Sequence, residues 1–186
     1  MAFTTVYSDP TQVAAPNLYK ALKAAIAQYA FPLLPADNIR RGLQTGVSLP
    51  QSDEFAVMYF NDRRRIGTNL KQYTNPASAQ IEKGTLAELT LWETAAQVSF
   101  FSIAYLAEQR AESFKTFVRG SIGAAHFRQY GIGSAYCDDL RILDNVDGQK
   151  RQVQHAIVNV HLQYYSGISA QLPFTNGANV VLRPLF

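Results

Sequence analysis

Residues 140–165 read LRILDNVDGQKRQVQHAIVNVHLQYY, and this stretch decides the fold class. An apolar run at 140–143 and a longer run at 149–165 flank the turn at 145–148, whose Asp-Gly pair favours a β-hairpin. Apolar side chains recur at every second position of the longer run, at Ala156, Val158, Val160, Leu162 and Tyr164. Polar residues alternate with them, at His155, Asn159, His161 and Gln163. This alternation predicts an antiparallel hairpin with one buried face and one face toward solvent or a partner.

Two stretches outside the hairpin have helical periodicity. Between Asn17 and Phe31 the apolar residues are spaced to form one face, with Asn17 as a cap and Phe31-Pro32 as the end. Residues 104–118 repeat the pattern, and Gly120 follows as a helix end. Residues 121–129 are compatible with one or two further helical turns. These patterns predict two main helices.

Strands and loops fill the remaining positions. Residues 54–66 are apolar on both sides, which indicates a central strand, and residues 86–102 predict one long bent strand or two. The stretches 32–52 and 67–84 are rich in proline, glycine or polar residues and predict long loops. We therefore expect an α+β fold, a mostly antiparallel sheet packed by two helices, in a single domain over 1–186. Its core spans about 14–165, and 166–186 form a C-terminal arm.

Composition excludes several classes of protein. The chain has 186 residues, of which 47% are apolar and 17% charged, so it carries enough apolar sequence for a core and is not disordered as a whole. No apolar run approaches the length of ~18 residues that a membrane-spanning helix needs. The first residues lack the basic and apolar regions of a secretory signal, and the single cysteine excludes an internal disulfide. We expect a soluble chain that is made in the cytoplasm and has no membrane partner.

The positive charge is concentrated in the first 75 residues, which hold 8 basic and 5 acidic residues. Basic side chains of this region can neutralise phosphates or contact a neighbouring subunit. Consecutive arginines on an extended segment must point alternately to opposite faces, so they do not make one patch. The candidate contact residues are Arg40, Arg41, Arg63, Arg64, Arg65 and Lys71.

A search for catalytic or metal-binding chemistry finds little. His155 and His161 lie roughly 20 Å apart on one strand face, too far to share a metal. Cys137 precedes Asp138 and Asp139, whose charge raises a thiol pKa, and those two aspartates suit a turn better than acid–base work. Known nucleotide and hydrolase motifs are absent. We expect no enzyme activity, no catalytic residue, no metal and no cofactor.

Several segments together resemble phage neck or tail terminator proteins. The hairpin stretch from Asp138 to Phe174 carries the resemblance, including Val158-Asn-Val-His-Leu-Gln-Tyr and Leu172-Pro-Phe. Upstream, Phe55-Ala-Val-Met-Tyr-Phe and Arg65-Ile-Gly-Thr-Asn resemble that family's central strand and loop. Ala96-Gln-Val-Ser-Phe and the helix after it resemble its strand-then-helix core. The resemblance covers about residues 54–174, and the stretches 67–84 and 180–186 have no counterpart in it.

The resemblance implies a structural virion protein of a tailed phage. Such subunits form a ring, usually of six copies, that ends the tail tube and joins the tail to the head-side connector. The implied partners are copies of the chain itself, the tail-tube protein, a connector or neck protein, and double-stranded DNA passing through the lumen without sequence-specific contact. Independently of the resemblance, the apolar end of the chain predicts an arm that docks on its own domain or on a neighbour, with Phe174, Val180, Val181, Leu182, Leu185 and Phe186.

Three alternatives remain open from the sequence. A collar or gateway ring in the neck differs from a terminator only in its neighbours. A nucleic-acid-binding module would use the basic residues and show a salt dependence of several phosphates. An enzyme centred on Asp138 and Asp139 would show metal-dependent activity that is lost on Asp139→Ala.

Overall fold

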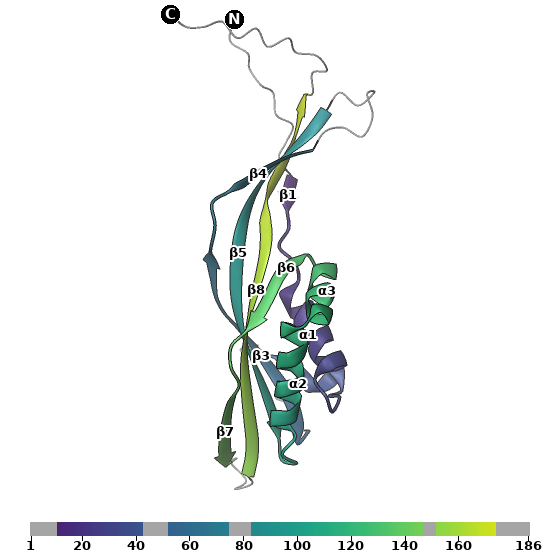
Figure 1. The fold of residues 1–186 in the computed structure, drawn as a ribbon, viewed down its shortest axis with the longest axis vertical. Coiled ribbons are helices and arrows are strands. Elements are labelled where there is room, and N and C mark those ends of the chain that lie inside the picture. The colour runs from purple at the N-terminus through teal and green to yellow at the C-terminus, as the bar shows by residue number, and fades with distance from the viewer. Residues whose placement is uncertain (1–10, 43–51, 75–82, 147–151, 174–186) are drawn as a thin grey trace, which may run out of the picture. The chain divides into compact units, whose positions relative to one another are not determined.

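The computed structural model describes residues 11–42, 52–74, 83–146 and 152–173 (Figure 1). The packing of the chain divides it into two compact units. The larger unit holds residues 15–66 and 91–165, and the smaller unit holds residues 1–14, 67–90 and 166–186. The single domain expected from the sequence stays a prediction.

The larger unit is built on a mixed sheet. Its strands are β2 (Ile39–Arg41), β3 (Glu54–Arg65), β6 (Ile132–Cys137) and β7 (Arg141–Val146), with parts of β5 (Lys83–Ser102) and β8 (Gln152–Pro173). The strand order is β8–β5–β3–β2, and β6 and β7 also pair with β8. The pairs β3–β5, β6–β8 and β7–β8 are antiparallel, whereas β2–β3 is parallel. The hairpin predicted from residues 140–165 is therefore confirmed as β7 and β8.

Three helices lie on one side of this sheet (Figure 1). They are α1 (Leu18–Tyr29), α2 (Ala107–Arg119) and α3 (Ser121–Gln129), and a short 3-10 helix, η1, covers Ala36–Asn38. The side chain of Asn17 caps α1 by accepting a hydrogen bond from the backbone N–H of Lys20 at 3.0 Å. The α+β fold is confirmed, with three helices rather than two.

The core lies between the helices and the sheet. Each helix contributes one apolar face, as its periodicity predicts, and the sheet contributes alternate residues of β3, β5 and β8. The largest fully buried side chains include Phe100, Phe114, Phe127, Leu22, Ile26, Met58 and Leu162. Where the three helices meet, the rings of Tyr29 and Phe117 stack with centroids 3.9 Å apart.

The described part of the smaller unit is built mainly of strands. Strand β1 (Thr11–Val13) pairs with residues 167–169 of β8, and β4 (Leu70–Thr74) pairs with residues 85–89 of β5, both antiparallel. A Cβ added at Gly167 would lie 2.0 Å from the carbonyl oxygen of Glu88. This close approach of two backbones requires glycine at position 167.

The sequence-based predictions differ from the structure in four places. The expected loop at 32–52 contains η1 and β2, and the expected loop at 67–84 contains β4. Strand β6 was not anticipated, and β8 runs on to Pro173, into the range of the expected arm. The residues of the expected docking arm, from Phe174 to Phe186, lie outside the described residues. None of the described helices is long and apolar enough to cross a membrane.

Candidate interaction surfaces

An irregularity in β3 decides which way its arginines point. Phe60 lies opposite Ala96 of β5, and Arg63 lies opposite Thr94, so β3 holds one more residue than β5 over this step. This β-bulge reverses the alternation of side chains along β3. Arg63 therefore lies on the same face as Phe60, which is the face covered by the helices, and Arg64 lies on the opposite face.

Arg41 and Arg63 come together on the helix-bearing side. Arg41 of β2 lies opposite Met58, and its guanidinium sits 5.4 Å from the ring centre of Phe60. The guanidinium of Arg63 lies over Trp92 at 4.0 Å and near Tyr164 at 5.6 Å. Both arginines line a groove of about 300 Å³ whose other lining residues are Pro16, Asn17, Leu18, Tyr19, Phe60 and Thr94. We call Arg41, Phe60 and Arg63 the arginine edge.

Arg64 belongs to a different cluster, which is centred on Glu93. Arg64 donates to Oε1 of Glu93 through Nε at 2.8 Å and through Nη2 at 2.6 Å. The Tyr136 hydroxyl and the Gln163 amide each donate to Oε2 at 2.9 Å. The ring of His161 stacks on Tyr136, with its Nδ1 3.7 Å from Oε1 of Glu93. Strands β3, β5, β6 and β8 thus all meet at one carboxylate, which is 3% exposed.

The cluster fixes the protonation state of Glu93. The hydrogen bond from Gln163, with further ones from Tyr136 and Arg64, lowers the pKa of Glu93 from 4.5 to about 2, against the opposing effect of burial. The hydrogen bond to Glu93 in turn raises the pKa of Arg64. Burial, followed by the bond to Glu93, raises the pKa of Tyr136. The carboxylate is therefore ionised at neutral pH and holds four strands together.

The other basic candidates lie elsewhere. Arg40 is half-buried on β2, and its Nε has no hydrogen-bond partner among the described residues. Arg65 is exposed at the end of β3, opposite Trp92. Lys71 lies in the smaller unit, where it pairs with Glu88 at 3.4 Å. In the larger unit, Arg41 and Arg63 share a groove, whereas Arg64 faces the opposite side of the sheet. Contact of the six with DNA or another subunit stays a prediction.

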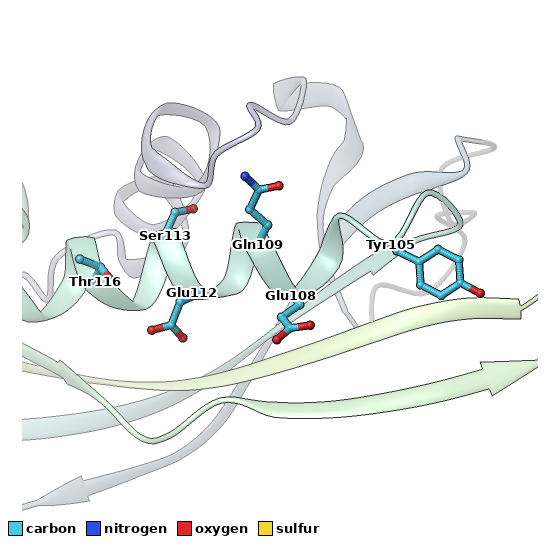
Figure 2. A pocket seen from close by; sticks show the side chains of 6 residues that line it. All are labelled: Tyr105, Glu108, Gln109, Glu112, Ser113 and Thr116. Atoms are coloured by element: carbon cyan, nitrogen blue, oxygen red, sulfur yellow. The ribbon is translucent and has the colours of Figure 1, made fainter.

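A second surface, which the sequence did not reveal, lies on α2. An open depression of about 620 Å³ is lined by Tyr105, Glu108, Gln109, Glu112, Ser113 and Thr116 (Figure 2). This α2 depression contains two carboxylates and no basic residue among its lining. Tyr105 at one end is 56% exposed and has a positive φ of 58°, which is rare outside glycine. The only hint of this surface in the sequence was the i,i+4 spacing of Glu108 and Glu112, which places both carboxylates close together on a helix.

The residues that the sequence offered for catalysis or metal binding take part in packing, hydrogen bonds and ion pairs. Cys137 is buried, its thiol donates to the carbonyl oxygen of Lys115 at 3.7 Å, and burial is the main cause that raises its pKa. Asp139 pairs with Arg119 at 3.1 Å, and Asp138 lies 3.4 Å from Nε2 of His161. His155 stacks on Phe101, and burial lowers its pKa. In the described ranges, no three His, Cys, Asp or Glu residues are grouped to hold a metal ion.

Comparison with known proteins gives one family. A family model described as phage neck terminator protein matches residues 17–181. The matched range begins at the cap of α1 and includes all three helices and both surfaces described above. No curated protein matches the chain significantly.

Proposed function

This chain belongs to the phage neck terminator protein family, and we propose that it forms a ring that ends the tail tube. The family is one of structural proteins of the phage neck, so the chain is a virion component. In the proposed assembly, the ring sits at the head-proximal end of the tube, stops its polymerisation and joins it to the head-side connector. The observation that carries the proposal is the family match over residues 17–181.

The larger unit is suited to a ring of identical subunits. A closed ring uses a heterologous interface, in which one surface of a subunit contacts a different surface of the next. The strand order ends in β2 at one edge of the sheet and continues past β8 to β6 and β7 at the other edge. The two edges therefore carry different residues. This difference supports head-to-tail contact, and a homohexamer is the copy number we propose.

The proposed partners are the tail-tube protein, a connector or neck protein on the head side, and double-stranded DNA in the lumen. DNA contact would go through phosphates without reading sequence. Arg64 and Lys71 already pair with Glu93 and Glu88, which reduces the positive charge that they can offer to a polyanion. This pairing favours the ring over a dedicated nucleic-acid-binding module.

The proposal is tested in a phage whose copy of this chain is disrupted. We expect tail tubes of excessive and variable length that are not joined to heads, and we expect the intact chain to restore normal tails when supplied in trans. Electron microscopy measures both outcomes. Tubes of normal length without heads would favour a collar or gateway ring instead. Tails of normal length joined to heads would contradict both assignments.

A further inference from the structure

The α2 depression is an acidic surface, and only one of its two carboxylates pairs with a cation of the same helix. Glu108 and Glu112 are both exposed. Glu112 pairs with Lys115 at 3.3 Å, whereas Glu108 has no ion-pair partner in the part of the chain that the structure describes. Figure 2 shows both carboxylates on the side of α2 away from Ser113, whose hydroxyl contacts Phe31 after α1. The acidic side of α2 therefore faces away from α1.

The arginine edge is the opposite kind of surface. Arg41 and Arg63 are exposed, and the aromatic rings under their guanidinium groups hold them in place. The guanidinium of Arg41 has N–H groups that can donate to carboxylates. No described residue forms an ion pair with Arg41. The arginine edge thus presents positive charge on a fixed support.

These two surfaces lie toward opposite ends of the strand order in the larger unit. The backbone N–H of Glu108 donates to the side chain of Gln154 on β8 at 3.2 Å, and Gln154 is paired with Asp144 on β7. Arg41, by contrast, lies on β2, the strand at the other end of the order. One subunit can therefore use both surfaces at once, with a different neighbour on each side.

We propose that the α2 depression of one subunit receives the arginine edge of a second copy of this chain. This inference rests on the proposed function and names the interface of the ring. A second copy is favoured as the occupant because the two surfaces match in charge and because their placement toward opposite ends of the strand order repeats head to tail. DNA fits this depression poorly, since its phosphates and the two carboxylates carry like charge.

Charge reversal gives a defined test with the full-length chain. The variants are Arg41→Glu, Glu108→Arg and an equimolar mixture of the two. The charge-matched controls are Arg128→Glu at the end of α3 and Asp37→Arg in η1, both exposed. Circular dichroism checks that each variant is folded, and mass photometry and analytical ultracentrifugation measure self-association, alone and with tail tubes.

The mixture is informative because the two variants can alternate around a closed ring. In an alternating ring, every second interface keeps the native Arg41 and Glu108, and the interfaces between them hold the reversed pair. We therefore expect each single variant to weaken self-association by about tenfold or more. The mixture restores assembly to near the wild-type level, and the two controls assemble like the wild type. As a second measurement, a chain with Arg41→Cys and a chain with Glu108→Cys are expected to be joined by a bismaleimide reagent, which spans the longer reach of an arginine–glutamate pair. Cys137 is buried and should not compete for the reagent.

Several outcomes would overturn the interface. They are unaltered assembly of the single variants, failure of the mixture to assemble, and absence of the cross-link. Titration with duplex DNA addresses the competing occupant of the arginine edge. A variant Arg41→Glu that loses DNA binding but assembles normally would assign that edge to DNA. Charge-reversed variants that form rings and cap tubes like the wild type would overturn the interface but leave the proposed function standing. A wild-type chain that neither self-associates nor caps tubes would overturn both.

Discussion

Glu93→Gln is the substitution that most directly tests how the sheet is held together. It removes the charge from a carboxylate that is 3% exposed and accepts hydrogen bonds from Arg64, Tyr136 and Gln163. The pKa of Glu93 falls from 4.5 to about 2 on folding, which corresponds to about 3 kcal/mol of stability carried by the ionised form. We expect Glu93→Gln to lower the free energy of unfolding at pH 7 by about that amount.

The effect has a defined dependence on pH. Because the folded pKa lies below the unfolded value, the stabilisation is fully present above pH 4.5 and is lost as the pH falls toward about 2. Roughly 2 of the 3 kcal/mol are gone at pH 3 by this linkage. The wild type and Glu93→Gln therefore differ by about 3 kcal/mol at pH 7 and by only about 1 kcal/mol at pH 3.

Urea unfolding followed by circular dichroism at both pH values measures this difference. The matched control is Glu88→Gln, which removes a partly exposed carboxylate paired with Lys71 and should cost less than about 1 kcal/mol. A difference between wild type and Glu93→Gln that is as large at pH 3 as at pH 7 would refute the reasoning. Its origin would then be packing and not charge.

Three further predictions concern local features. Gly123→Ala should lower the free energy of unfolding by about 1–3 kcal/mol, because the added Cβ would lie 2.2 Å from the carbonyl oxygen of Phe117; an unchanged melting temperature would contradict this. Asn17→Ala should cost about 1 kcal/mol through loss of the cap on Lys20, as measured by urea unfolding, and a neutral effect would show that α1 needs no cap. Cys137 should react far more slowly with a thiol reagent at pH 8 than a cysteine in an unfolded chain, since burial raises its pKa; equal rates would argue against its burial.

The first of these three has a control within the chain. A Cβ added at Gly133 of β6 would lie 3.7 Å from the carbonyl oxygen of Gln163, which is an ordinary contact. Gly133→Ala should therefore leave the melting temperature within a few degrees of the wild type, corresponding to less than about 1 kcal/mol. An equal loss for both substitutions would mean that the close approach at Gly123 is not the cause.

Local signals in the sequence predicted the long elements well. Helix α1 begins at its predicted cap and ends before Phe31-Pro32. Strand β3 forms where the run is apolar on both sides, and β8 follows the alternation of apolar residues in the predicted hairpin. Short strands were missed, since their pairing is set by tertiary contact and not by local pattern. Strand β2 has only three residues and is a strand because residues 56–58 of β3 lie beside it.

The candidate site was predicted less completely than the fold. Alternation correctly placed Arg63 and Arg64 on opposite faces, but the bulge that decides which face each takes arises from pairing with β5. The cluster at Glu93 was not anticipated, because its partner Gln163 is 70 positions away along the chain. An acidic residue inside the apolar strand run at 86–102, where only Glu88 and Glu93 are charged, was the available signal. Such a residue needs a partner when it is buried.

The most direct measurement of the assembly role is electron microscopy with mass photometry of the purified chain, alone and mixed with tail-tube protein. The ring account predicts closed rings of about six copies, or caps at one end of each tube, with masses at multiples of the 20.7 kDa chain. A chain that remains a monomer at high concentration and leaves the ends of the tubes bare would contradict it.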